Sequence, residues 1–208
     1  MNVLENSKIY FNCDYTEGAH QKIIDTLLKT NLVQTIGYGE DYFCDNARET
    51  IKKACGNNSI DVHFLVGGTQ ANFTVISSIL KPYQGVLSAQ TGHINVHETG
   101  AIEATGHKVL SLSCPADGKI TGAQIDNACI SHYNDSSFEH MVQPGMVYIS
   151  QPTEIGAIYS KAELTKRSDV CKRYNMPLFI DGARLGYALA SEENDVTLED
   201  LCNICDVF

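Results

Sequence analysis

The sequence predicts an α/β fold, a three-layer arrangement in which helices cover both faces of a mainly parallel sheet. Segments with helical spacing of apolar residues alternate along the chain with short apolar or β-rich segments. Alternation of this kind calls for parallel strands joined by helices. The clearest strand is residues 178–180, because it is short and apolar and follows a charged segment with a helical pattern. Its carboxyl end is where open α/β sheets bind ligands.

The expected helices combine apolar residues at helical spacing with residues that favour helix ends. Asp45 and Thr197 are placed to cap the helices that follow them. Ser160 and Glu163 form a capping box, and Pro82 stops the helix before it. In chain order, helices are expected at residues 20–32, 45–55 and 70–80, within 93–106, near 123–133, at 160–174, near 183–190 and after 197.

The expected strands are short segments rich in apolar and β-branched residues. They lie at residues 60–66, 85–88, 108–112, 146–150 and 178–180. A further strand has barely begun at residues 205–208. We therefore expect the chain to be a truncated one that stops inside a strand.

Composition bounds the class of protein. The 208 residues suffice for a domain with a real core, and 43% hydrophobic and 19% charged residues are typical of a globular chain. A net charge of −10, with no block of basic residues, argues against binding to nucleic acid. The polar N-terminus and the lack of a long apolar run predict a cytoplasmic protein without a membrane span. Eight scattered cysteines fit reduced thiols better than a disulfide framework.

An acid and a guanidinium follow the strand at residues 178–180. The sequence there is Asp181-Gly182-Ala183-Arg184. An acid in this place can bind a cationic ring nitrogen, and the arginine can bind a carboxylate through two parallel hydrogen bonds. The alternative is an Asp181–Arg184 ion pair that caps the next helix.

Two further features come after strand ends. Gly67, Gly68, Thr69 and Gln70 form a strand-to-helix turn that suits one small phosphate, although it is neither a Walker loop nor a dinucleotide fingerprint and could be a plain turn. His93 can stack flat on an aromatic ligand ring. The alternative for this histidine is a metal site with His97 and Glu98, but Glu98 would not share their helix face, and we expect no metal.

Together these features call for a ligand with a phosphate, an aromatic ring and a basic ring nitrogen. Pyridoxal 5'-phosphate has all three. Asp181 would keep the pyridine nitrogen protonated, so that the ring can accept electrons from a substrate carbanion. Gly68, Thr69 and Gln70 would hold the phosphate, His93 would cover the ring, and Arg184 would bind the carboxylate of an amino acid.

The same features resemble those of a known family. The motifs 37–41, 68–72, 93–101 and 181–186, in this order and spacing, are similar to those of the threonine aldolase and β-eliminating lyase family. The resemblance covers nearly the whole chain, and it implies the aspartate-aminotransferase fold, pyridoxal phosphate and a dimeric or tetrameric homo-oligomer. It also implies cleavage of threonine or allo-threonine to glycine and an aldehyde.

The resemblance also implies roles and a domain plan. Asp181, Arg184 and His93 correspond to the acid, the substrate arginine and the stacking histidine, and Gly68 and Thr69 to the phosphate turn. Cys13 and Tyr38 are expected at the substrate, with Tyr38 donated by a neighbouring subunit. Residues 1–30 would form an N-terminal segment with the first helix, residues 31–208 a truncated large domain, and a C-terminal small domain would be absent.

Three departures from the family pattern affect the expected activity. No lysine lies in the context of the family's cofactor-binding lysine, so the chain as given should be inactive. Thr153 stands where many threonine aldolases have a histidine, which leaves the base to a water or to His97. Cys13 stands where a serine is usual.

The residues leave other functions open. β-Elimination or racemisation would use the same cofactor site with another base and substrate pocket. A non-catalytic, oligomerising or cofactor-binding protein would follow if the natural chain also lacked the lysine. A zinc hydrolase would use His93, His97 and Glu98.

Overall fold

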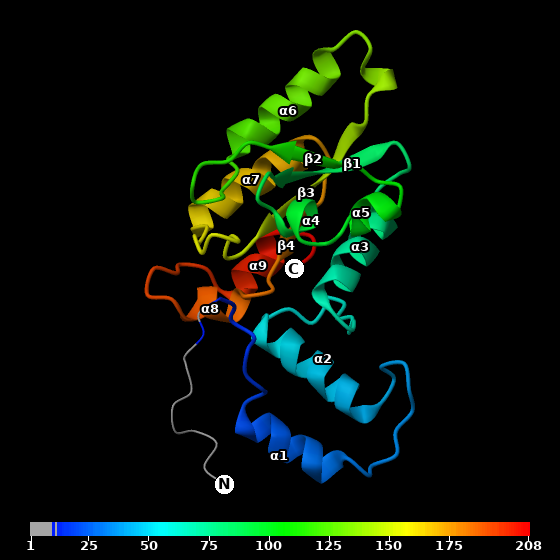
Figure 1. The fold of residues 1–208 in the computed structure, drawn as a ribbon, viewed down its shortest axis with the longest axis vertical. Helices are drawn as coiled ribbons and strands as arrows, with labels where there is room; N and C mark the ends of the chain where they lie inside the picture. Colours follow the sequence, from blue (N-terminus) through cyan, green and yellow to red (C-terminus); the bar gives the residue numbers. More distant parts are fainter. Residues whose placement is uncertain (1–9, 11) are drawn as a thin grey trace. The chain divides into compact units, whose positions relative to one another are not determined.

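The computed structural model describes residue 10 and residues 12–208, and it divides the chain into two compact units, residues 1–45 and 46–208 (Figure 1). The first unit contains α1 (Gln21–Thr30) and the start of α2 (Tyr42–Ala54). The sheet and all later helices belong to the second unit. The predicted boundary at residue 30 stays a prediction, and part of the predicted N-terminal segment, residues 1–9 and 11, lies outside the described residues.

The sheet of the second unit has four parallel strands in the order β2-β1-β3-β4. The strands are β1 (Gln84–Ala89), β2 (Val109–Leu112), β3 (Gln143–Ser150) and β4 (Leu178–Asp181). Ser150 lies opposite Asp181 in the register, and Ala89 lies opposite Leu112. The strands therefore end at one common edge, which is the edge that the sequence predicted for a ligand.

Helices cover both faces of this sheet, as predicted (Figure 1). One apolar cluster joins the strands to α6, α7 and α9, and includes Ile125, Leu164 and Leu201. The other joins them to α3 and α5, and includes Ile76 and Ile102. The helices are α3 (Gly68–Ile79), α4 (His93–Val96), α5 (Ala101–Ala104), α6 (Gly122–Asn134), α7 (Lys161–Arg173), α8 (Leu185–Ala190) and α9 (Leu198–Ile204), with a short 3₁₀ helix at Phe138–His140.

The predicted strand at residues 60–66 is wrong. This segment is irregular, and Phe64, Leu65 and Val66 are exposed, Val66 to 97%. A strand needs a partner for its backbone N–H and C=O groups. In the described part of the chain, the segment that lies beside β4 is instead the one with Val207, which forms a parallel bridge with Phe179. The strand predicted at residues 205–208 is therefore present as this single bridge beside β4.

Two helix predictions also need correction. Asp45 lies inside α2, and the carboxylate of Asp41 accepts hydrogen bonds from the backbone N–H groups of Phe43 and Cys44 at the start of that helix. The helix expected within residues 93–106 is split into α4 and α5. Thr99 and Gly100 between them have φ values of 55° and 74°, in the left-handed region that interrupts a right-handed helix.

The predicted capping box of Ser160 with Glu163 and the predicted cap at Thr197 are confirmed, and Asp200 completes a second capping box with Thr197. All eight cysteines are free thiols. Within the described part of the chain, no helix is both long and apolar enough to cross a bilayer.

Candidate active site at the carboxyl edge of the sheet

Asp181, the last residue of β4, carries a carboxylate that is surrounded by donors. Its Oδ2 accepts hydrogen bonds from the Tyr148 hydroxyl at 2.5 Å and from Asn72 Nδ2 at 3.0 Å. Its Oδ1 accepts from the backbone N–H of Ala183 at 2.9 Å. These three donors fix the orientation of the carboxylate. The carboxyl edge of the sheet therefore presents an oriented acid.

Tyr148 is a member of this site that the sequence did not single out. It is fully buried in β3, where its ring packs edge-on against Phe179. Burial raises the pKa of its hydroxyl, and the neighbouring negative charge of Asp181 and the hydrogen bond to it raise this pKa further. Tyr148 therefore keeps its proton and acts as a permanent donor to Asp181. The signal in the sequence was weak, because a tyrosine in a buried strand looks like an ordinary core residue.

Asn72 connects Asp181 with Glu98. The Asn72 amide donates to Glu98 Oε1 at 2.6 Å as well as to Asp181 Oδ2. Asn72 is 2% exposed and lies one turn into α3, and Glu98 is 5% exposed. The sequence included Asn72 in a motif but gave it no role.

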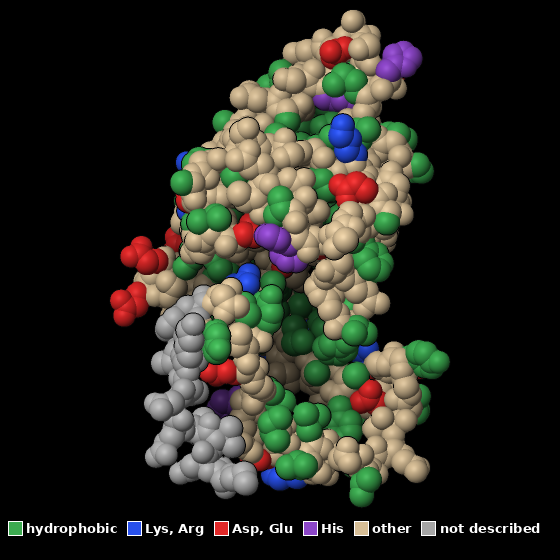
Figure 2. All heavy atoms as spheres, viewed as in Figure 1, with side chains coloured by type: hydrophobic (Ala, Val, Ile, Leu, Met, Phe, Trp, Pro, Cys, Tyr) green, Lys and Arg blue, Asp and Glu red, His purple; other side chains and the backbone are tan. Residues whose placement is uncertain are grey.

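His93 joins the same network through its ring. His93 Nδ1 lies 2.8 Å from Glu98 Oε1, and the ring is 41% exposed. Because the partner is a carboxylate, Nδ1 carries the proton in this hydrogen bond. The Glu98 Oε2 atom is buried and has no hydrogen-bond partner among the described residues. Figure 2 shows histidine side chains (purple) at the surface over α4, where a flat ligand could reach them.

Glu154 fixes the backbone of His93. Its Oε1 accepts from the His93 N–H at 2.8 Å and from the Ser150 hydroxyl at 2.6 Å. An acid accepts such an N–H well, because the first N–H groups of a helix lack partners within it. The start of α4 is thereby tied to the end of β3. The sequence did not predict this contact.

The predicted phosphate turn begins α3. Gly67 precedes the helix in an extended conformation, and Gly68 and Thr69, both exposed, open it. The Gln70 side chain accepts from the Val66 N–H at 2.8 Å and so holds the turn together. A Cβ atom on Gly67 or Gly68 would meet nothing within 4 Å, so the space beside the turn is open. The positive end of the helix dipole points into this space.

The other residues that the sequence singled out lie in three further parts of the chain. Arg184 is exposed and precedes α8. Thr153 is 3% exposed, and its hydroxyl donates to the Asp117 carbonyl at 2.7 Å and accepts from the Ala157 N–H. It therefore stabilises its own loop and is not available as a base. Cys13 and the exposed Tyr38 belong to the N-terminal unit.

The metal alternative finds little support. His93 contacts Glu98 directly, but the His93 and His97 rings only lie side by side, with centroids 5.6 Å apart. Among the described residues, no three His, Cys, Asp or Glu side chains are grouped closely enough to hold a metal ion.

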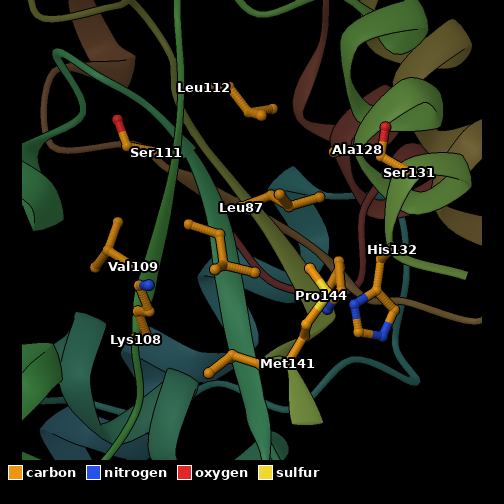
Figure 3. A pocket seen from close by; sticks show the side chains of 12 residues that line it. Leu87, Lys108, Val109, Ser111, Leu112, Ala128, Ser131, His132, Met141 and Pro144 are labelled. Atoms are coloured by element: carbon orange, nitrogen blue, oxygen red, sulfur yellow. The ribbon is translucent and has the colours of Figure 1, made fainter. Parts of the chain in front are cut away.

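A separate pocket of about 420 Å³ lies at the β2 edge of the sheet (Figure 3). It is lined by β1, β2, the end of α6 and the segment before β3, with Leu87 and His132 among its residues. None of the predicted cofactor residues lines it. Because its walls are mostly apolar and carry no acid to bind a ring nitrogen, we place the candidate site at Asp181 and not here.

With this geometry described, comparisons with known proteins identify the family. Residues 15–208 match the family described as beta-eliminating lyase. The chain belongs to this family. Low specificity L-threonine aldolase of Pseudomonas sp. (strain NCIMB 10558) is a relative, 32% identical over 182 residues, which are 86% of this chain and 51% of that protein. A probable low-specificity L-threonine aldolase of Schizosaccharomyces pombe is 28% identical over 69% of this chain and 37% of its own length.

Solved structures agree with the family assignment. The threonine aldolase of Leishmania major superposes with a TM-score of 0.88 and 47% identity, over 92% of this chain and 55% of that one. An aminotransferase from Escherichia coli superposes with a TM-score of 0.70 at 16% identity, which shows the fold alone. This beta-eliminating lyase chain spans about half the length of the relatives it matches.

Proposed function

We propose that the protein containing this chain is a pyridoxal-phosphate-dependent lyase that cleaves β-hydroxy-α-amino acids, such as threonine or allo-threonine, to glycine and an aldehyde. The observation that carries the proposal is the Asp181 carboxylate, held by Asn72 and Tyr148 at the end of β4. The likeness to threonine aldolases supports this reaction over others of the same fold.

The side chains fit pyridoxal phosphate. Asp181 offers an oriented carboxylate to a protonated ring nitrogen, and its donors Asn72, Tyr148 and the Ala183 N–H are all neutral. The open turn at Gly67 and Gly68 offers backbone N–H groups to a phosphate. His93 offers a partly exposed ring, which Glu98 orients through Nδ1. When bound, the cofactor supplies an electron sink for the carbon that loses its side chain.

Each of these residues has a task in the proposed reaction. Asp181 keeps a proton on the ring nitrogen, and Gly68, Thr69 and Gln70 bind the phosphate. His93 covers the ring and excludes water from that face. Arg184 binds the substrate carboxylate.

The base that removes the hydroxyl proton is not Thr153, since this side chain is buried in its own loop. We propose that a water, or the exposed His97, takes this proton. The identity of the base separates this reaction from others that use the same cofactor site. β-Elimination or racemisation of an amino acid is therefore the second candidate function. Both would keep Asp181 and Arg184 in the same tasks.

We further propose a cytoplasmic homo-oligomer, a dimer or a tetramer. The free thiols fit a reducing compartment. Within α1, Ile23, Leu27 and Leu28 are all more than half exposed, and Figure 2 shows hydrophobic side chains (green) on the visible face of this helix. Apolar side chains so exposed favour association. We also propose that Cys13 and Tyr38 contact the substrate. The present chain by itself is expected to be inactive.

The test uses the natural, uninterrupted protein and its absorption spectrum with pyridoxal phosphate, before and after threonine is added. We expect a band of bound cofactor that shifts with threonine while glycine accumulates. A band without glycine would move the assignment to elimination or racemisation. The absence of any bound-cofactor band would contradict the proposal as a whole.

A further inference from the structure

Asn72 is buried between two acids, and one side-chain amide serves both. Its two N–H bonds point to Glu98 Oε1 at 2.6 Å and to Asp181 Oδ2 at 3.0 Å. An amide nitrogen has only two hydrogens, so both of its donors are used. The two acceptors lie 26 and 109 residues away along the chain. The Asn72 amide therefore connects α3 with the two segments that carry Glu98 and Asp181, which are distant in the sequence.

Glu98 depends strongly on this amide. Its Oε1 has Asn72 and His93 as donors, and its Oε2 is buried without a partner in the part of the chain that the structure describes. A buried carboxylate with few donors is costly, because its lost hydration must be replaced. If the Asn72 amide were removed, Glu98 would keep just one of these two donors, His93, and the His93 ring would lose the fixed acceptor that sets its orientation.

Asn72 also lies on the helix that starts with the phosphate turn. Gly68 opens α3, and Asn72 follows one turn later on the buried side of the same rigid element. One helix therefore connects the turn, the acid Asp181 and, through Glu98, the ring of His93. These are the groups that the proposed cofactor would contact at its phosphate, its ring nitrogen and its ring face.

We propose that Asn72 is a positioning residue that fixes Asp181 and, through Glu98, His93 in one frame against the cofactor ring. This inference rests on the proposed function. Without the amide, Asp181 keeps Tyr148 and the Ala183 N–H as donors, but its distance from Glu98 is no longer set. The phosphate turn would remain intact, while the two ring contacts would no longer be held in one orientation.

The test compares two substitutions in the natural full-length protein. Asn72→Asp keeps the shape but places a third carboxylate against Glu98 and Asp181. Asn72→Leu removes both donors and adds no charge. We expect both to weaken pyridoxal phosphate binding, Asn72→Leu by about tenfold, the size expected when buried acceptors lose a donor. Asn72→Asp should bind still more weakly, because like charges repel at short range.

The matched control is Ile76→Val. Ile76 is fully buried one turn further along α3 and belongs to an apolar cluster. The substitution should lower the melting temperature and leave cofactor affinity within about twofold, since a buried methyl group affects packing alone. If Asn72 only packed the helix, its variants would behave like this control, and Asn72→Asp would be tolerated better than Asn72→Leu.

Crystal structures of the cofactor-free wild type and of Asn72→Leu supply a readout that does not depend on cofactor binding. We expect the Asp181 carboxylate and the His93 ring to move in the variant. If both stay in place, or if cofactor affinity in both Asn72 variants equals that of the wild type, the positioning role is wrong. A wild type that binds no pyridoxal phosphate would overturn the proposed function, and the positions of Asp181 and His93 would still decide the role of Asn72.

Discussion

Arg184 is the residue through which we expect the substrate carboxylate to bind. Replacing it by glutamine removes the guanidinium but keeps a polar side chain of similar reach. A hydrogen bond to a charged group contributes about 1.5–3 kcal/mol, so kcat/KM for threonine should fall roughly tenfold to hundredfold. The cofactor spectrum should not change, because Arg184 is not proposed to contact the cofactor. Steady-state kinetics and spectra of the natural protein check this expectation.

The control for Arg184→Gln is Arg173→Gln. Arg173 is also an arginine near the surface, and it pairs with Asp126 at 2.9 Å across α7 and α6. An exposed ion pair contributes little to stability, and neither partner is among the residues proposed to bind cofactor or substrate. Arg173→Gln should therefore leave kcat/KM unchanged. An equal loss in both variants would remove the special role of Arg184.

Tyr148 provides a second test at the scale of a single residue. Tyr148→Phe deletes the hydroxyl that donates to Asp181 Oδ2 and keeps the ring in its core position. Asp181 is half-buried and keeps its other two donors, so the lost hydrogen bond corresponds to about 1 kcal/mol and the dissociation constant of pyridoxal phosphate should rise about fivefold. Tyr159→Phe is the matched control, since this buried hydroxyl accepts from the Ile120 N–H in the other apolar cluster. It should reduce stability and spare cofactor affinity, which a fluorescence titration can measure.

Among the elements, α7 shows how local chemistry sets a helix end. Ser160 Oγ accepts from the Glu163 N–H, and Glu163 Oε2 accepts from the Ser160 N–H at 2.8 Å and from Lys119 Nζ at 2.8 Å. Ser160→Ala should cost about 1 kcal/mol of stability, the usual effect of losing an N-cap. Thr165→Ala, within the same helix, should be neutral or stabilising, because alanine has the higher helix propensity. Urea unfolding followed by circular dichroism can compare the two variants with the wild type. A Ser160→Ala midpoint equal to that of the wild type would show that the cap contributes nothing to stability.

Whether a contact is local or distant in the sequence explains what the sequence could predict. The capping box at Ser160, the end of β4 and the turn before α3 depend on neighbouring residues, and all were predicted. A strand at residues 60–66 was wrong because a strand requires a partner, which no local pattern supplies. The roles of Asn72 and Tyr148 were missed for a similar reason. Their contacts to Asp181 span 109 and 33 residues, and an asparagine in a helix or a tyrosine in a strand gives no sign of such a distant acid.

At the scale of the whole molecule, buried thiols couple stability to alkaline pH. Burial raises the pKa of Cys129 to about 11 and that of Cys171 to about 12, from an ordinary value of 9.0. Cys205 behaves in the same way, with a pKa of about 12. Above pH 9 the unfolded chain would release these protons while the folded chain keeps them. Stability is then complete below the unfolded-state pKa and falls as pH rises through the folded-state values, by up to about 1.4 kcal/mol per pH unit for each thiol.

We therefore expect the urea midpoint, measured under reducing conditions, to fall steadily from about pH 8.5 to pH 10.5, because the unfolded thiols titrate in this range. Cys171→Ala should make this fall less steep, although the cavity lowers the midpoint at neutral pH. Ile125→Val, in the same apolar cluster, should lower the midpoint by a similar amount at every pH and leave the steepness unchanged. The two variants separate packing from proton linkage, since only the cysteine carries a proton that the unfolded chain gives up. A midpoint that stays level across this range, or an equal steepness in Cys171→Ala and the wild type, would show that the buried thiols do not control alkaline unfolding.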